Sequence, residues 1–300
     1  MHEDNEQVIQ YKTNSESNAF PDSEFVEKQW ALAHLKITDL WQMTMGSEEI
    51  LVAVLDTGID TNHEDLQGKL EAEVNFTESQ NSDDIYGHGT PIAGIIAAGN
   101  NQKGILGLAP DCRLLNVKVA DDRGRCDVSD LVEGIVWAVN NGADVINISI
   151  EINEASLELE TAINYAWQEG VVVVAAAGNS GTLDPVYPAY YENCISVTAI
   201  KDDNSLSPLS NRGQWIDLAA PGYQIFSTLP GSNYGFETGT SFASAHVSGV
   251  VALLLTIVDD SNNDGFKNDE VLEIIKKGSQ KSSTDGSGWS YIDTSKMLAF

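Results

Sequence analysis

Cysteine and basic side chains are scarce in this chain of 300 residues, and each shortage excludes a class of protein. The three cysteines, Cys112, Cys126 and Cys194, are too few and too scattered for a disulfide scaffold or a cysteine-ligated zinc site. Lysine and arginine number 16 against 45 aspartate and glutamate residues, which gives a formal charge of −29. Such a surface repels phosphate backbones, so we expect no nucleic-acid partner. The excess of acid fits bound cations, a salty habitat or basic substrates, and alone it favours none of them.

Long hydrophobic runs are also missing. The longest apolar stretch, residues 245–258, is shorter than the ~20 residues that cross a bilayer, and it contains His246, Ser248 and Gly249. We therefore expect a buried helix there and no membrane span. The N-terminus has neither a basic start nor an apolar core, so it does not resemble a signal peptide. Either the chain stays inside the cell or its leader is not part of this sequence.

The order of polar and apolar segments predicts one arm and one domain. Residues 1–28 are polar and lack periodicity, which predicts an N-terminal arm or linker before a domain at 29–300. Near-continuous apolar runs predict strands that are buried on both faces, at 50–55, 114–119, 144–149, 171–177 and 194–200. Helical patterns alternate with them at 128–142 and 156–170, each ending on a glycine as helix C-caps do. This alternation predicts an α/β fold of three layers, a central, mostly parallel sheet with helices on both faces.

Three polar residues stand where such sheets gather function, at strand ends and helix starts. Asp56 follows the first apolar run, His88 opens a small-residue helix in YGHGTPIAGIIAAG, and Ser241 opens the long apolar helix in GTSFASAHVSGVVALLL. Singly, each also fits a turn cap, a surface histidine or an N-cap serine. Together they fit nucleophilic catalysis, in which an imidazole takes the serine proton and a carboxylate orients the imidazole. Asn179, just past a strand end, is placed to donate to an oxyanion beside the backbone N–H of Ser241.

Seven segments resemble the subtilisin-like serine endopeptidases, the subtilase family with its subtilisin and thermitase branches. They are VAVLDTGID, GHGT, GILGLAP, DVINIS, VVVVAAAGN, AAPG and GTSFASAHVSGVVALLL, in family order between residues 29 and 277. The resemblance implies the three-layer subtilisin-like fold and hydrolysis of peptide bonds in proteins through an acyl-enzyme on Ser241. It implies His88 as general base and then acid, Asp56 as the orienting carboxylate and Asn179 as the oxyanion donor. The chain order Asp, His, Ser is that of subtilisin itself.

Three residues depart from the family pattern. Pro91 replaces a second histidine after GHGT, Ala245 replaces a proline, and Phe242 replaces the methionine that commonly follows the nucleophile. None of them removes a catalytic atom, so we expect activity, and Phe242 predicts a site less prone to oxidative inactivation. A maturation protease of narrow specificity remains open. A silent binding domain that kept the fold is disfavoured, because all four catalytic residues are present.

In the family, substrate adds as an extended strand between two enzyme segments. The matching segments here are Gly124-Arg125-Cys126 and Ser149-Ile150-Glu151. By the same resemblance, Ala176, Ala177 and Gly178 form the wall of the primary pocket, and Val186 forms its floor. Val128 and Leu131 form an apolar subsite further upstream. The apolar floor indicates a shallow pocket for medium apolar side chains. Glu151, where the family normally has glycine, favours a basic side chain instead, and the sequence leaves both open. Ordinary core packing is an equal alternative for the subsite residues.

The loop at 97–110 resembles the family's high-affinity calcium loop, without insertion or deletion. The resemblance implies structural calcium, held by side chains and carbonyl oxygens of Asp22, Asp65, Gly99, Asn101, Lys103 and Ile105. A weaker cation site at the carbonyls of Ala189 and Tyr191 stays open. The acidic run at 259–270 begins like an EF-hand loop but has Val271 where that loop needs glutamate. We therefore expect a solvated loop there, leading into a helix at 268–277, and weak calcium binding by this loop stays open.

The family resemblance also implies partners and a compartment. It implies protein or peptide substrates, a monomer and a separate N-terminal prodomain, which residues 1–28 are too short to be. Calcium-dependent stability favours secretion, whereas the odd cysteine count and the missing leader leave an intracellular protein open. A pairing of Cys112 with Cys126 also stays open, because sequence does not place their Cα atoms.

Overall fold

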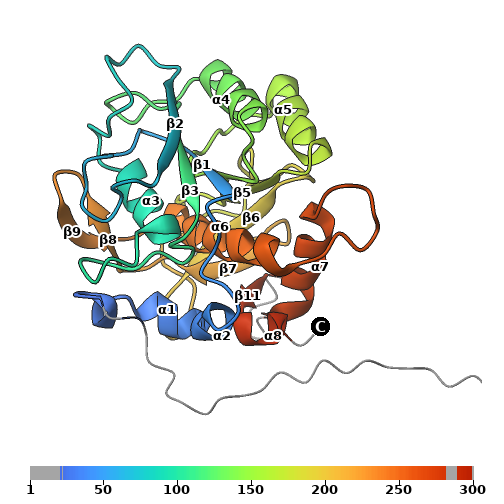
Figure 1. Cartoon of the computed structure of the whole chain (residues 1–300). Coiled ribbons are helices and arrows are strands. Elements are labelled where there is room, and N and C mark those ends of the chain that lie inside the picture. Colours follow the sequence, from blue (N-terminus) through green and yellow to red (C-terminus); the bar gives the residue numbers. More distant parts are fainter. Residues whose placement is uncertain (1–20, 22, 282–288, 299–300) are drawn as a thin grey trace, which may run out of the picture.

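The computed structural model describes residue 21 and residues 23–281 and 289–298. Within these residues, one sheet of nine strands runs through the molecule in the order β10-β11-β7-β6-β5-β4-β1-β3-β2 (Figure 1). Neighbouring strands are parallel except β10 and β11. The strands of this sheet are β1 (Leu51–Asp56), β2 (Leu70–Asn75), β3 (Arg113–Lys118), β4 (Val145–Ile148), β5 (Val172–Ala176), β6 (Ile195–Ile200), β7 (Leu218–Pro221), β10 (Ser279–Lys281) and β11 (Ser290–Ile292). A separate hairpin pairs β8 (Ile225–Leu229) with β9 (Asn233–Glu237).

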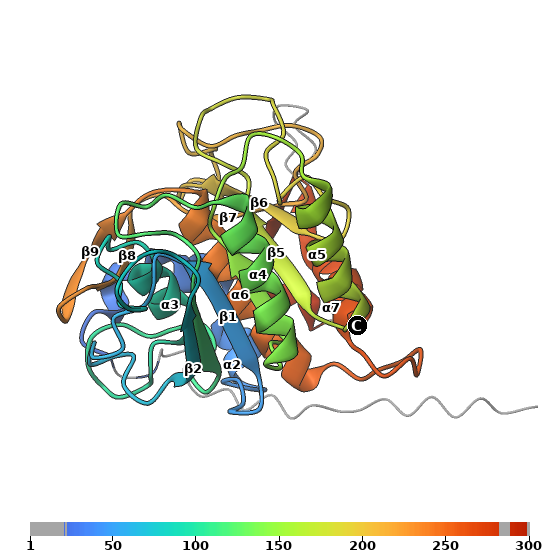
Figure 2. The same cartoon turned by 90° about the horizontal axis from the view of Figure 1, so that it is seen from above.

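Helices cover both faces of the sheet. Figures 1 and 2 show α4 and α5 side by side on one face, and α6 lies on the other. Four of the helices that flank the sheet are α4 (Val128–Asn140) and α5 (Leu157–Gln168) on the first face, with α3 (Gly89–Ala97) and α6 (Thr240–Ile257) on the second. The remaining helices pack on the α6 face and are η1 (Val26–Lys28), α1 (Trp30–Leu35), α2 (Thr38–Trp41), α7 (Asn268–Gly278) and α8 (Thr294–Met297).

The alternation of side chains along β1 explains the three layers. Val52 and Val54 pack into the core beneath α6, while Ala53 and Leu55 pack into the core beneath α4 and α5. All four side chains are buried, because successive residues of a strand point to opposite faces and both faces are covered. The predicted α/β fold with helices on both faces of a mostly parallel sheet is confirmed.

The five strands expected from apolar runs are β1, β3, β4, β5 and β6, each within about one residue of its expected range at either end. The two expected helices are α4 and α5, and Gly142 and Gly170 follow them with φ of 81° and 80°, a conformation that glycine adopts without strain. The buried helix expected at 245–258 is the greater part of α6. By length and hydropathy α6 is able to cross a membrane, but 89% of that stretch is buried inside the protein.

The N-terminal arm and the acidic loop are described in part. Of the arm, residue 21 and residues 23–28 are described, and Phe25 packs its ring against those of Phe226 and Tyr234. The boundary expected at residue 28 stays a prediction, because residues 1–20 and 22 lie outside the described ones. The loop before α7 is largely exposed, as expected, and α7 begins at Asn268.

Candidate active site

The first pair of catalytic candidates meets where β1 ends and α3 begins. Nδ1 of His88 lies 2.8 Å from Oδ1 and 3.0 Å from Oδ2 of Asp56. Asp56 is buried, and its Oδ1 also accepts the backbone N–H of Thr57 at 2.7 Å. A carboxylate that accepts from Nδ1–H leaves Nε2 of a neutral ring with its lone pair. The pair therefore presents His88 as a base whose tautomer is set by Asp56.

A second buried carboxylate, Asp84, supports this pair, and sequence reasoning missed it. One oxygen of Asp84 accepts from Thr57 Oγ1 and from the Gly87 N–H, both at 2.7 Å, and the other accepts from the Thr90 N–H at 2.8 Å. Asp84 thus ties the residue after Asp56 to the start of the helix that follows His88. The available signal was an acid four residues before His88, ahead of a helix N-terminus, where carboxylates bind free N–H groups.

The electrostatic surroundings of His88 favour the imidazolium. Burial alone lowers the pKa of His88, because a low-dielectric site penalises the charged ring. The charge of Asp56 and its hydrogen bond raise the pKa, Asp84 and Glu237 add to this, and the net result is a pKa above the ordinary 6.5. This sign suits a catalytic base, because the protonated ring that forms during acyl transfer is stabilised.

The second pair of candidates meets at the start of α6. Ser241 is the second residue of α6, after Thr240. Oδ1 of Asn179 accepts the N–H of Thr240 at 2.9 Å and its Oγ1 at 3.2 Å. These two bonds fix the amide oxygen on the helix N-terminus, so the amide Nδ2 is the free end. Asn179 therefore has a donor to offer beside the N–H groups of the helix start.

All four candidates line one open cleft of about 280 Å³. The other residues that line it are Thr57, Tyr86, Ala120, Gly124, Cys126, Ser149, Ile150, Glu151 and Ile152. The carboxyl ends of parallel strands share one edge of a sheet, and β1, β4 and β5 run into Asp56, Ser149 and the segment before Asn179 at that edge. The structure thus brings together the four residues proposed from the motifs.

A model of the subtilase family matches residues 47–290. The chain belongs to the subtilase family. It is 37% identical over 270 residues to thermitase of Thermoactinomyces vulgaris, which covers 89% of this chain and 94% of thermitase. It is 42% identical over 253 residues to a thermophilic serine proteinase of Bacillus sp. (strain AK1), covering 84% of this chain, and 40% identical over 231 residues to subtilisin E of Bacillus subtilis (strain 168), covering 76%. The chain spans 61% of the length of each of these last two relatives.

The substrate-binding candidates of this subtilase divide into two groups. Gly124, Cys126, Ser149, Ile150 and Glu151 line the cleft. The others do not line it: Ala176, Ala177, Gly178, Val186 and Leu131 are buried, Val128 is half-buried, and Arg125 is exposed and paired with Asp121 at 2.6 Å. The facing segments therefore supply five of the residues that line the cleft, and the substrate-binding roles of both groups stay predictions.

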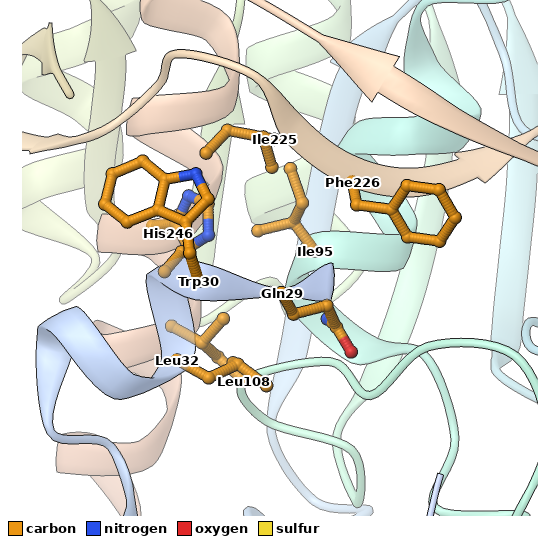
Figure 3. Close-up of a pocket in the computed structure, with 9 residues that line it drawn as sticks. Gln29, Trp30, Leu32, Ile95, Leu108, Ile225, Phe226 and His246 are labelled. Atoms are coloured by element: carbon orange, nitrogen blue, oxygen red, sulfur yellow. The ribbon is translucent and has the colours of Figure 1, made fainter. Parts of the chain in front are cut away.

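The histidine of the serine motif, His246, does not line the cleft. It is buried beside Trp30 and Leu32 in a small pocket on the α1 side of α6 (Figure 3). Its Nδ1 donates to the carbonyl of Phe242 at 2.7 Å, and burial lowers the pKa of His246 to about 4. His246 is therefore a neutral core residue of the subtilase.

The cysteines are all free thiols. Cys112 and Cys126 are not joined, which settles the pairing that the sequence left open. Burial raises the pKa of Cys126, which lines the cleft, to about 12, and the carboxylates of Asp130 and Asp127 add to this. Its thiol is therefore protonated and a poor nucleophile.

The predicted calcium ligands lie together, apart from Asp22, which is outside the described residues. Oδ2 of Asp65 accepts the N–H of Ile105 at 2.9 Å, and Oδ1 lies 3.3 Å from Nδ2 of Asn101. The backbone N–H of Gly99 donates to the Asp65 carbonyl at 2.9 Å, and the backbone N–H of Lys103 donates to Oδ1 of Asn101 at 2.9 Å. Asp65 is buried, and this burial raises its pKa. The predicted ligands thus lie in the loop next to Asp65, and they include the carboxylate, carbonyl and amide oxygens that calcium takes.

Proposed function

We propose that this subtilase is the catalytic domain of a serine endopeptidase that cleaves peptide bonds in proteins through an acyl-enzyme on Ser241. The observation that supports the proposal is the hydrogen-bonded pair of Asp56 and His88, on a cleft that Ser241 and Asn179 also line. Thermitase and the thermophilic serine proteinase support the same activity by relationship.

In the proposed mechanism each group has one task. His88 takes the proton of Ser241 as the hydroxyl attacks the scissile carbonyl, and Asp56 stabilises the imidazolium that forms. The Nδ2 group of Asn179 and the N–H of Ser241 bind the oxyanion of the tetrahedral intermediate. His88 then gives its proton to the leaving amine, and water, activated by the same base, releases the acyl group.

The substrate in this proposal is an extended peptide that lies between residues 124–126 and 149–151 and adds as a strand. Backbone hydrogen bonds supply much of the affinity in this mode, and pockets supply the selection of side chains. We further propose a secreted monomer that folds with a separate prodomain. The greater length of subtilisin E and of the thermophilic serine proteinase is compatible with such an additional segment.

A fluorophosphonate probe tests the activity directly, because it reacts with an activated serine whatever the substrate preference. We expect the mass of intact protein to increase by one adduct, and the adduct to be absent in Ser241→Ala. Asn179→Ala retains the nucleophile but loses one oxyanion donor, so its kcat on a cleavable peptide is expected to fall about 10²- to 10³-fold, as for the corresponding donor in subtilisin. Folded wild-type protein without an adduct would contradict the proposal.

We also propose that calcium binds at the Asp65 loop. The support is a buried carboxylate that has no cationic partner within 4 Å among the described residues, beside carbonyls of the same loop. Gly104 fits this arrangement, because a Cβ there would collide with Asp65 Oδ2 and with the hydroxyl of Tyr234. Asn101 would serve as a ligand after its amide turns over and points its oxygen toward Asp65. Bound calcium would tie the loop to Asp65 and contribute stability rather than chemistry.

Thermal unfolding with and without calcium tests this site without any activity assay. Saturation at about 100 times Kd stabilises the folded state by about 2.7 kcal/mol, so the Tm is expected to rise with calcium concentration. Asp65→Asn is expected to lose this response, whereas Asp202→Asn, at an exposed acid away from the loop, should retain it. An equal calcium response in Asp65→Asn would contradict the assignment.

A further inference from the structure

The side chain of Glu151 crosses between two segments of the cleft. Its Oε2 accepts the backbone N–H of Asn179 at 3.2 Å, and Oε1 lies 3.5 Å from Oγ of Ser180. A Cβ built on Gly178 would lie 2.7 Å from Oε2, so the carboxylate rests directly against the backbone of Gly178. Glu151 therefore places a negative charge between residues 149–151 and 178–180, on the cleft that Ser241 also lines.

This charge has only neutral partners. Within the described part of the chain, no lysine, arginine or histidine forms an ion pair with Glu151. Arg125, in the facing segment 124–126, is paired with Asp121 at 2.6 Å instead. Glu151 is half-buried as a residue, and both hydrogen bonds of its carboxylate are exposed, so a cation that enters the cleft can reach the carboxylate. A carboxylate held only by neutral donors can form a charge-assisted hydrogen bond with such a cation.

We propose that Glu151 makes the cleft selective for lysine or arginine immediately before the scissile bond. This inference rests on the proposed endopeptidase function and names its substrate class. An ammonium or guanidinium group that enters between the two segments forms an ion pair with Glu151. A bulky apolar side chain has either to displace the carboxylate from Asn179 and Ser180 or to bury it without a cation, and both are unfavourable.

The geometry also connects selection with catalysis. Glu151 binds the backbone N–H of Asn179, whose side chain is anchored on Thr240 and offers its Nδ2 to the oxyanion. An apolar substrate that displaces Glu151 removes one of the bonds that hold Asn179, whereas a basic substrate keeps it. We therefore expect the preference to affect kcat as well as KM.

The first test uses the wild-type protein with peptides that differ only in the residue before the scissile bond: arginine, lysine, leucine, phenylalanine and alanine. We expect kcat/KM for arginine and lysine to exceed the values for leucine and phenylalanine by about 10- to 100-fold, as for a charge-assisted contact. Equal or faster cleavage after leucine, phenylalanine or alanine would overturn the inference.

The second test uses Glu151→Gln, which keeps the size and an acceptor oxygen but removes the charge. The ratio of kcat/KM for arginine over leucine is expected to fall about 10- to 100-fold. Glu154→Gln is the control, because Glu154 is an exposed acid in the same loop, and its ratio should match the wild type. An arginine preference that survives in Glu151→Gln would show that Glu151 is not its source.

Fluorophosphonate labelling distinguishes a failure of the proposed specificity from a failure of the proposed endopeptidase function. Wild-type protein that is labelled at Ser241 but lacks a preference for basic residues would refute the specificity and leave the endopeptidase function standing. Wild-type protein that folds and is not labelled would refute the function itself. The peptide series on wild type needs no variant, so the inference is tested even where Glu151→Gln does not fold.

Discussion

At the scale of single residues, the protonation of His88 controls the proposed chemistry. Only the neutral ring accepts the serine proton, and the pKa of His88 lies above 6.5 because Asp56, Asp84 and Glu237 outweigh the effect of burial. We therefore expect kcat/KM to fall as the pH drops through a value above 6.5, measured as a pH profile on a peptide substrate. Glu237→Gln removes one of the charges and should move this acid limb to lower pH. A wild-type limb at or below 6.5 would contradict the role given to these carboxylates.

Phe242 provides a second prediction at this scale. Its side chain is buried, and its ring centroid lies 5.8 Å from that of His88. Phe242→Met would place an oxidisable thioether next to Ser241, so we expect hydrogen peroxide to inactivate this variant well before the wild type. Residual activity and intact mass after peroxide treatment measure the difference. Cys126 is the internal check, because its raised pKa keeps the thiol protonated and slow to oxidise, and rapid loss of wild-type activity would point to it.

At the scale of elements, the position of α3 depends on a close approach to β8. A Cβ on Gly94 would collide with Oγ1 of Thr228 and lie 3.0 Å from its Cγ2. Gly94→Ala is therefore expected to destabilise the protein by about 1–3 kcal/mol, the usual cost of overpacking, in denaturant unfolding. Because α3 begins at Gly89, just after His88, activity should fall as well.

A double-mutant cycle checks that this contact is the cause. Thr228→Ala removes both colliding atoms but also a hydrogen bond from Oγ1 to the Thr90 carbonyl at 2.8 Å. If the collision is the source, Gly94→Ala costs less in the Thr228→Ala background than in the wild type. If the losses of stability from the two substitutions simply add, the destabilisation by Gly94→Ala does not come from its contact with Thr228.

The elements that the sequence predicted share a physical property. β1, β4 and β5 are buried on both faces, so they appear as continuous apolar runs. β2 lies at the edge of the sheet and alternates between exposed and half-buried residues, and β9 is partly exposed, so neither produces such a run. The helices α1 and α2 span six and four residues, too few to show a helical period.

The same contrast holds within the site. Asp56, His88, Asn179 and Ser241 stand in long motifs, and their meeting follows from strand ends at one edge of the sheet. Asp84 had a local signal in its place ahead of a helix N-terminus, whereas the direction of the Glu151 side chain depends on which backbone N–H groups come within reach after folding. Glu151 bonds to Asn179, which lies 28 residues further along the chain. A contact between residues so far apart in sequence leaves no local sequence pattern.

At the scale of the whole molecule, the formal charge of −29 opposes compactness. Salt shortens the reach of this repulsion from about 30 Å at 0.01 M to about 3 Å at 1 M. With calcium chelated, we expect the Tm to rise with potassium chloride over this range, measured by calorimetry. Potassium separates this general effect from the calcium loop, and a Tm that does not change or falls would contradict it.

The negative field also bears on substrate choice. It extends over the surface and attracts cationic peptides toward the cleft, where Glu151 selects among them. The general field and the single carboxylate therefore act in the same direction but differ in range. High salt should weaken the general attraction of the negative surface more than the local attraction of the Glu151 carboxylate.

The proposed nucleophile, Ser241, lies on α6, far along the chain from Asp56 and His88, and this has a consequence for the order of synthesis. A ribosome makes Asp56 and His88 long before Ser241, and α6 also supplies the apolar centre of the core. A growing chain that has not yet reached residue 257 has neither the complete helix nor the packed sheet that aligns the cleft. The proposed proteolytic capacity therefore arises only once α6 has been made, well after Asp56 and His88.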